Sequence, residues 1–133
     1  MTRTVHDAIA AAERLLPGIP APDGESDPRW QAIIEVEEFL PSNPNEIWPF
    51  IRRWGSHEDD DLRAAIATCL LEHLLEDHFE IFFTKVEQAV KDSPLFADTF
   101  LRCGRFGQAK EPANTARFTQ LTRLARELNM KSR

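Results

Sequence analysis

The chain has 133 residues, of which 42% are hydrophobic and 29% charged, with two cysteines and a formal net charge of −6. This length suits one domain with its own core, and this composition excludes a disordered or collagen-like chain. No stretch approaches the roughly 18 consecutive apolar residues of a membrane span, and the N-terminal residues lack the apolar core of a signal peptide, so we expect a cytoplasmic domain with no membrane contact.

Apolar residues recur at helical spacing rather than at alternate positions, which predicts an all-α fold. Capping residues, prolines and glycines divide the chain into seven helical segments. They are expected at about residues 4–16, 27–40, 45–54, 61–77, 79–90, 93–103 and 114–128. A linker at about 18–26 and a loop at about 104–113 lie inside the single domain expected over residues 1–133.

Three helix starts recur at a fixed interval. The pairs Asp27-Pro28, Asp60-Asp61 and Ser93-Pro94 lie 33 residues apart, and another helix precedes each of them. Aligned on that period, the first two copies share Asp, Ala and Ile, whereas Asp98 and Thr99 interrupt the match in the third. The recurrence predicts about three helical hairpins plus a C-terminal helix, arranged as a short right-handed α-solenoid.

Residues 43–75 resemble a HEAT repeat. Asp59, the pair Leu62-Arg63 and the alanines that follow occupy the places of that family's acidic residue, its aliphatic-arginine pair and its alanine-rich second helix. The resemblance implies a curved scaffold that binds proteins or sometimes nucleic acid. It also implies that Asp59 and Arg63 belong to a structural ladder between neighbouring repeats.

Charge is distributed unevenly along the chain. Residues 1–100 contain 8 Lys/Arg against 20 Asp/Glu, whereas residues 101–133 contain 8 against 2. The basic segment either packs on the acidic body or presents a patch to an anionic partner. Its candidate partner-binding residues are Arg102, Arg105, Arg117, Arg123 and Arg126. A net negative chain argues against nucleic acid as the ligand.

A second candidate site lies on the helix expected at 61–77. Cys69, His73 and Asp77 follow one another at intervals of four residues, so on a regular α-helix they form one row that could hold a metal. The alternative is a structural role, in which the histidines bond neighbouring carbonyls or carboxylates and the cysteines are reduced, buried thiols.

No complete catalytic motif is present. The serines do not lie in a nucleophile elbow, and the acidic run 57–61 lacks the pattern of a calcium loop, so helix capping explains it better. Trp30, Trp48 and Trp54 are expected to pack between helices. The sequence therefore favours a non-enzymatic protein-binding module without a cofactor, such as an adaptor, a regulator or an immunity-type protein. A metal-binding protein or metal-dependent enzyme is the alternative.

Overall fold

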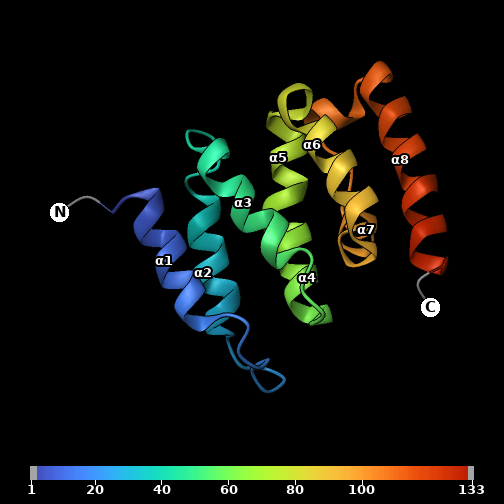
Figure 1. Cartoon of the computed structure of the whole chain (residues 1–133). Helices are drawn as coiled ribbons and strands as arrows, with labels where there is room; N and C mark the ends of the chain where they lie inside the picture. Colours follow the sequence, from blue (N-terminus) through green and yellow to red (C-terminus); the bar gives the residue numbers. More distant parts are fainter. Residues whose placement is uncertain (1–2, 132–133) are drawn as a thin grey trace.

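The computed structural model describes residues 3–131, and within them the chain forms seven helices and no strand (Figure 1). The helices are α1 (Val5–Leu15), α2 (Pro28–Glu37), α3 (Pro44–Trp54), α4 (Asp60–Ile66) with its continuations η1 (Ala67–Leu71) and α5 (Glu72–Asp77), α6 (Phe79–Asp92), α7 (Pro94–Leu101) and α8 (Pro112–Lys131). The all-α prediction is confirmed.

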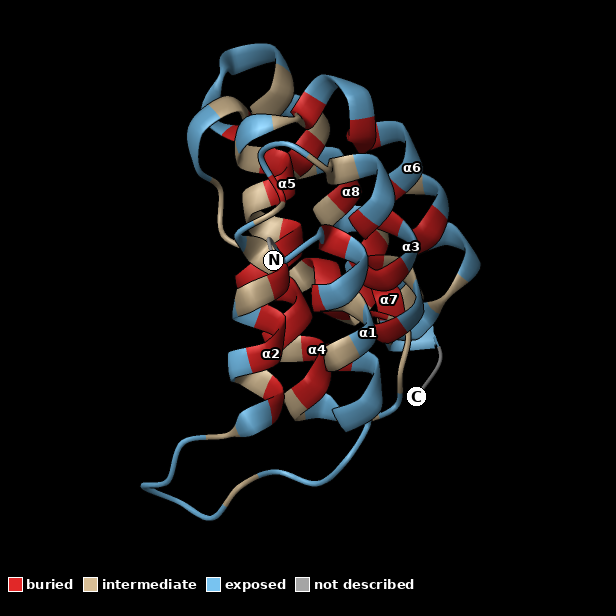
Figure 2. Ribbon diagram, turned by 90° about the vertical axis from the view of Figure 1, so that its left-hand side faces the viewer, coloured by how far each residue is buried: buried red, intermediate tan, exposed pale blue. Residues whose placement is uncertain are grey.

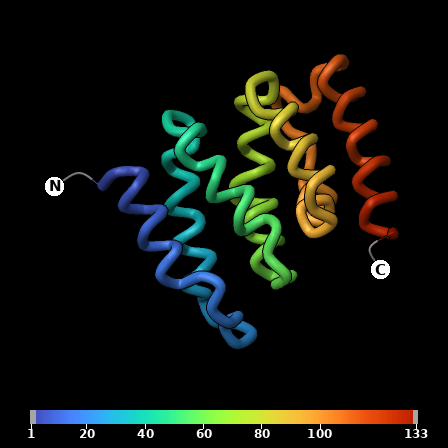
Figure 3. The backbone as a smooth tube through the Cα atoms, viewed as in Figure 1, coloured from blue at the N-terminus to red at the C-terminus, as the bar shows by residue number. Residues whose placement is uncertain are grey.

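The helices follow one another across the molecule in chain order, with α1 at one end and α8 at the other (Figures 1 and 3). Sequential neighbours pack as hairpins, most extensively α1 with α2, α6 with α7, and α7 with α8. Contacts between hairpins join α2 to η1, α1 to α3, and α4 to α7. The basic C-terminal segment therefore forms one end of the stack.

Side-chain caps fix several helix starts. Asp27 accepts a hydrogen bond from the backbone N–H of Arg29, and Ser93 accepts one from that of Phe96. In the helix between them the capping residue is Asp59, which accepts from Leu62 N–H, and not Asp60. The intervals between caps are therefore slightly unequal, although each satisfies a backbone donor that the helix leaves unpaired.

Two predicted boundaries were wrong. Helix α2 ends at Glu37 rather than near residue 40, and a turn follows it. The expected loop 104–113 contains a short 3₁₀ helix, η2 (Gly107–Lys110), and α8 begins at Pro112 rather than near Asn114. Proline suits the first helical position because its missing N–H would have no partner there.

A π-helical turn, η1, interrupts the central helix between α4 and α5. The N–H of Glu72 bonds the carbonyl of Ala67, five residues earlier, instead of the usual four. The turn adds one residue to the helical repeat, so the side chains after it are rotated about the axis relative to an uninterrupted α-helix.

The core runs continuously through the stack. Figure 2 shows buried positions on the faces that helices turn toward each other and exposed positions on the outer faces. The largest fully buried side chains of the core include five phenylalanines: Phe79, Phe82, Phe83, Phe96 and Phe100. Trp48 and Trp54 are buried as expected, whereas Trp30 is half-buried and donates its indole N–H to Asp61 at 3.0 Å.

Candidate functional site

Two of the five candidate arginines pair with acidic groups of the body. Arg102 donates at 2.9 Å to Asp98, which lies four residues earlier. Arg117 lies 3.5 Å from Glu87 and 3.8 Å from Glu80, and its guanidinium also stacks 4.9 Å from the ring centroid of Phe83. These two side chains carry charge that the body already balances.

The other three candidate arginines have no acidic partner within ion-pair distance among residues 3–131. Arg105 is half-buried, with its guanidinium 4.7 Å from the ring centroid of Phe118. Arg123 and Arg126 are exposed on α8. Arg105 and Arg126 line the same pocket of about 310 Å³, and Arg123 does not line it. The structure thus separates the five arginines into a paired and an unpaired group.

A buried arginine, Arg29, joins the first two hairpins. The Arg29 side chain is 4% exposed and donates to Asp61 at 2.6 Å, to Asp59 at 3.5 Å and to the carbonyl of Pro17 at 2.8 Å. Burial lowers the pKa of Arg29, but the hydrogen bond and charge of Asp27, together with the charges of the other carboxylates, outweigh that effect and raise it. Arg29 therefore remains charged inside the protein.

Arg63 makes the corresponding connection to the third hairpin. Its Nε and Nη2 both donate to Asp98, at 3.1 and 2.9 Å, and Nη1 donates to the carbonyl of His57 at 2.9 Å. Asp60 is a further, exposed partner of the same guanidinium. Asp98, which interrupts the sequence repeat, is thus the acceptor that links α4 to α7.

Thr99, the residue after Asp98, links the same two hairpins at a second point. Its buried hydroxyl donates to the carbonyl of Gly55 at 2.5 Å. The two residues that break the repeat at the sequence level therefore both bridge from α7 to the preceding hairpin.

The proposed metal row does not form one cluster. His73 Nδ1 lies 2.9 Å from Glu76 and its Nε2 lies 3.4 Å from Glu37, so both ring nitrogens face carboxylates rather than Cys69 and Asp77. No group of three or more metal-ligating side chains is found within residues 3–131.

His73 instead connects α2 to α5. Burial lowers its pKa, but the hydrogen bond that its ring donates to Glu76 and the charges of Glu37, Glu76 and Glu72 outweigh burial and raise the pKa above the ordinary value. The two cysteines are free thiols. Burial raises the pKa of both, and Cys103 Sγ lies 3.6 Å from the carbonyl of Ala67. High thiol pKa values oppose nucleophilic or metal-binding use.

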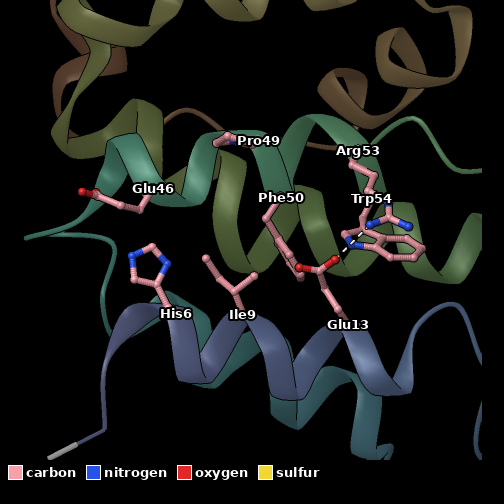
Figure 4. Close-up of a pocket in the computed structure, with 8 residues that line it drawn as sticks. All are labelled: His6, Ile9, Glu13, Glu46, Pro49, Phe50, Arg53 and Trp54. Atoms are coloured by element: carbon pink, nitrogen blue, oxygen red, sulfur yellow. Dashed lines mark hydrogen bonds and ion pairs between the residues drawn. The ribbon is translucent and has the colours of Figure 1, made fainter.

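A cleft of about 280 Å³ lies between α1 and α3 (Figure 4). His6, Ile9 and Glu13 extend into it from α1, opposite Phe50 and Arg53 of α3. Arg53 pairs with Glu13 at 2.9 Å and stacks on the Trp54 ring, whose buried N–H lacks a hydrogen-bond acceptor. Arg53 and Glu13 therefore neutralise each other in the cleft, and Glu46 leaves its lining with one more acidic than basic side chain.

Comparison with protein-family models, with curated proteins and with solved structures finds no match for this chain. Within residues 3–131, no helix combines the length and the hydropathy that crossing a bilayer requires.

Proposed function

We propose that the protein is a non-enzymatic protein-binding module on a HEAT-like helical stack, and that it binds through the α8 end. This function fits an adaptor, a regulator or an immunity-type protein in the cytoplasm. The observation that carries the proposal is the division of the candidate arginines: Arg102 and Arg117 are neutralised by the body, while Arg105, Arg123 and Arg126 are not. Unpaired arginines that gather at one end of a protein are typical of a surface completed by a partner.

The HEAT-like part of the proposal is supported by the buried arginines. Arg29 lies at the start of α2 and pairs with Asp61 of α4 at 2.6 Å. Arg63 of α4 pairs in the same way with Asp98 of α7, in the next hairpin, at 2.9 Å. Such repeated cation–carboxylate links between neighbouring units are what the sequence resemblance implies. We infer that they set the spacing and relative rotation of the hairpins.

The test is affinity purification from the native host with the tagged full chain. Arg123→Glu and Arg126→Glu are each expected to reduce recovery of the co-purifying protein, because each reverses one unpaired charge at the α8 end. Arg14→Glu is the matched control: Arg14 is also exposed, lies in the last turn of α1 and has no acidic partner among the described residues.

Equal recovery with all three variants would contradict the proposal. Retention on heparin that the two α8 variants abolish, without any co-purifying protein, would favour nucleic acid instead. Stoichiometric zinc, iron or manganese in the purified protein would favour the metal-binding alternative.

A further inference from the structure

A basic pocket lies between the end of α7, the loop after it, and α8. It has a volume of about 310 Å³, and its lining contains no aspartate or glutamate; the nearby Glu72 carboxylate is bonded to the N–H of the lining residue Gly104 at 2.6 Å. Apolar side chains and two arginines surround it: Phe100, Leu101, Phe118, Arg105 and Arg126. A pocket with this lining is suited to a ligand that is anionic at one point and apolar beside it.

Arg105 is held in place from the protein side. Its guanidinium stacks 4.7 Å from the ring centroid of Phe118, and that ring is itself 4% exposed and packs 4.7 Å from the Phe100 ring. Stacking uses the face of the guanidinium and leaves its N–H edge available for an acceptor. Arg105 is therefore oriented for binding before any ligand arrives.

Arg126 supplies the second cation from α8. It lies four residues after Thr122, which also lines the pocket, so the two positions share one face of the helix. Arg123 lies on the same helix, carries the same charge and is exposed, but it does not line the pocket. The helix thus provides both a pocket arginine and a nearby arginine outside it.

Neither of two further pockets has a purely basic lining. In the α1–α3 cleft, Glu13 and Glu46 accompany Arg53, and Arg53 is already paired with Glu13. In the apolar pocket beside the 17–27 loop, Arg29 is bonded to Asp27. Of these three pockets, the α7–α8 pocket is the one that combines two arginines with no acidic side chain in its lining.

We infer that the α7–α8 pocket receives a glutamate or aspartate side chain from an acidic, partly apolar segment of a partner protein. The inference rests on the proposed protein-binding function. Guanidinium groups bind carboxylates through paired N–H···O bonds, and the phenylalanine and leucine walls accommodate an aliphatic neighbour of the carboxylate. The pocket has room for a few side chains and not for a folded domain, so an extended segment is the fitting occupant.

The test is titration of the ¹⁵N-labelled full chain with a short capped peptide of alternating glutamate and leucine, followed by amide chemical shifts. Shift changes are expected at Gly104, Arg105, Thr122 and Arg126. Arg126→Glu is expected to weaken binding about tenfold or more, whereas Arg123→Glu has a smaller effect that added salt removes. Arg126→Lys keeps the charge but not the paired hydrogen bonds, so an intermediate loss is expected.

Three outcomes would overturn the inference. Equal effects of Arg123→Glu and Arg126→Glu would indicate general electrostatic attraction without a pocket. Equal binding of the peptide with glutamine in place of glutamate would show that no carboxylate is recognised. Tighter binding of a short single-stranded oligonucleotide, with the same dependence on Arg126, would assign the pocket to nucleic acid.

The peptide titration and the host purification can fail separately. Loss of the peptide effect with retained, α8-dependent capture of a host protein would reject the pocket and leave the proposed function standing. Peptide binding that depends on Arg126, without capture of any host protein, would reject the proposed function and leave the recognition of acidic segments.

Discussion

Replacing Arg63 with alanine removes the cation that joins the central hairpin to α7. The side chain is 5% exposed and donates twice to Asp98 and once to the carbonyl of His57. The change leaves Asp98, which is 19% exposed, and the His57 carbonyl without this donor. The variant thus tests whether the link between hairpins stabilises the stack.

The expected loss is about 2–3 kcal/mol of unfolding free energy. Breaking a buried ion pair by removing one partner costs roughly 3–5 kcal/mol, because the remaining charge is left in a poorly solvated place. The expected loss is smaller than that range for two reasons. Asp98 keeps its hydrogen bond from Arg102 at 2.9 Å, and Asp60, at 78% exposed, is readily solvated by water.

Equilibrium unfolding in urea measures this loss as a lower midpoint at an unchanged slope. Arg52→Ala is the matched control, since Arg52 pairs with Asp92 at 2.9 Å but both side chains are more than 40% exposed. That surface pair is expected to contribute less than about 1 kcal/mol. If Arg63→Ala destabilises the protein no more than Arg52→Ala does, the role assigned to the buried link is wrong.

The same link has a pH dependence. Burial raises the pKa of Asp98, but hydrogen bonds from Arg102 and Arg63 outweigh it and hold the pKa below the ordinary value. The stabilisation from Asp98 is thus present above the pKa of an unfolded aspartate, about 3.9, and is lost as the pH falls through the folded value. In Arg63→Ala the acid-dependent part of this loss is expected to shrink.

Three further predictions concern other described contacts. Thr99→Val removes the buried hydroxyl bond to Gly55 and is expected to cost about 1–2 kcal/mol in urea unfolding, whereas Thr99→Ser should cost less. The stabilisation from His73 is full below the pKa of an unfolded histidine, about 6.5, and is lost as the pH rises through the raised pKa of the folded protein. A His73→Gln variant whose unfolding free energy has the same pH dependence as the unchanged protein would contradict this. Cys69 is expected to resist alkylation in the native protein and to react promptly in denaturant, because burial raises its pKa; rapid native labelling would contradict this.

Helix positions were predictable because their signals are local. A capping side chain, a proline at the first helical position and an apolar stripe each act within one or two turns, so Asp27-Pro28 and Ser93-Pro94 mark helix starts without tertiary information. The boundary errors occur where such signals compete. Pro112 and Asn114 are both acceptable near a helix start, and only the packing of the preceding η2 turn distinguishes them.

The cross-hairpin contacts were not predictable in the same way. Repeat alignment treats Asp98 as a mismatch, because alignment compares residue types, whereas Arg63 requires only a carboxylate at the right place in space. The metal row shows the same limit of sequence spacing. Four-residue intervals select Cys69, His73 and Asp77, but they do not reveal that Glu37 of α2 and Glu76 approach the two ring nitrogens of His73.

The charge of the C-terminal segment also needs the structure for its interpretation. Counting residues gives a strongly basic end, but Arg102 and Arg117 are matched by aspartates and glutamates of the body. Of the five candidate arginines, Arg105, Arg123 and Arg126 remain available for a partner, and two of these three line one pocket with apolar walls. Attraction by a diffuse basic tail would depend on the number of charges and would fade with salt, whereas binding in this pocket depends on which arginine is changed. The comparison of Arg126 with Arg123 is therefore the measurement that separates the two ways in which this end of the protein can act.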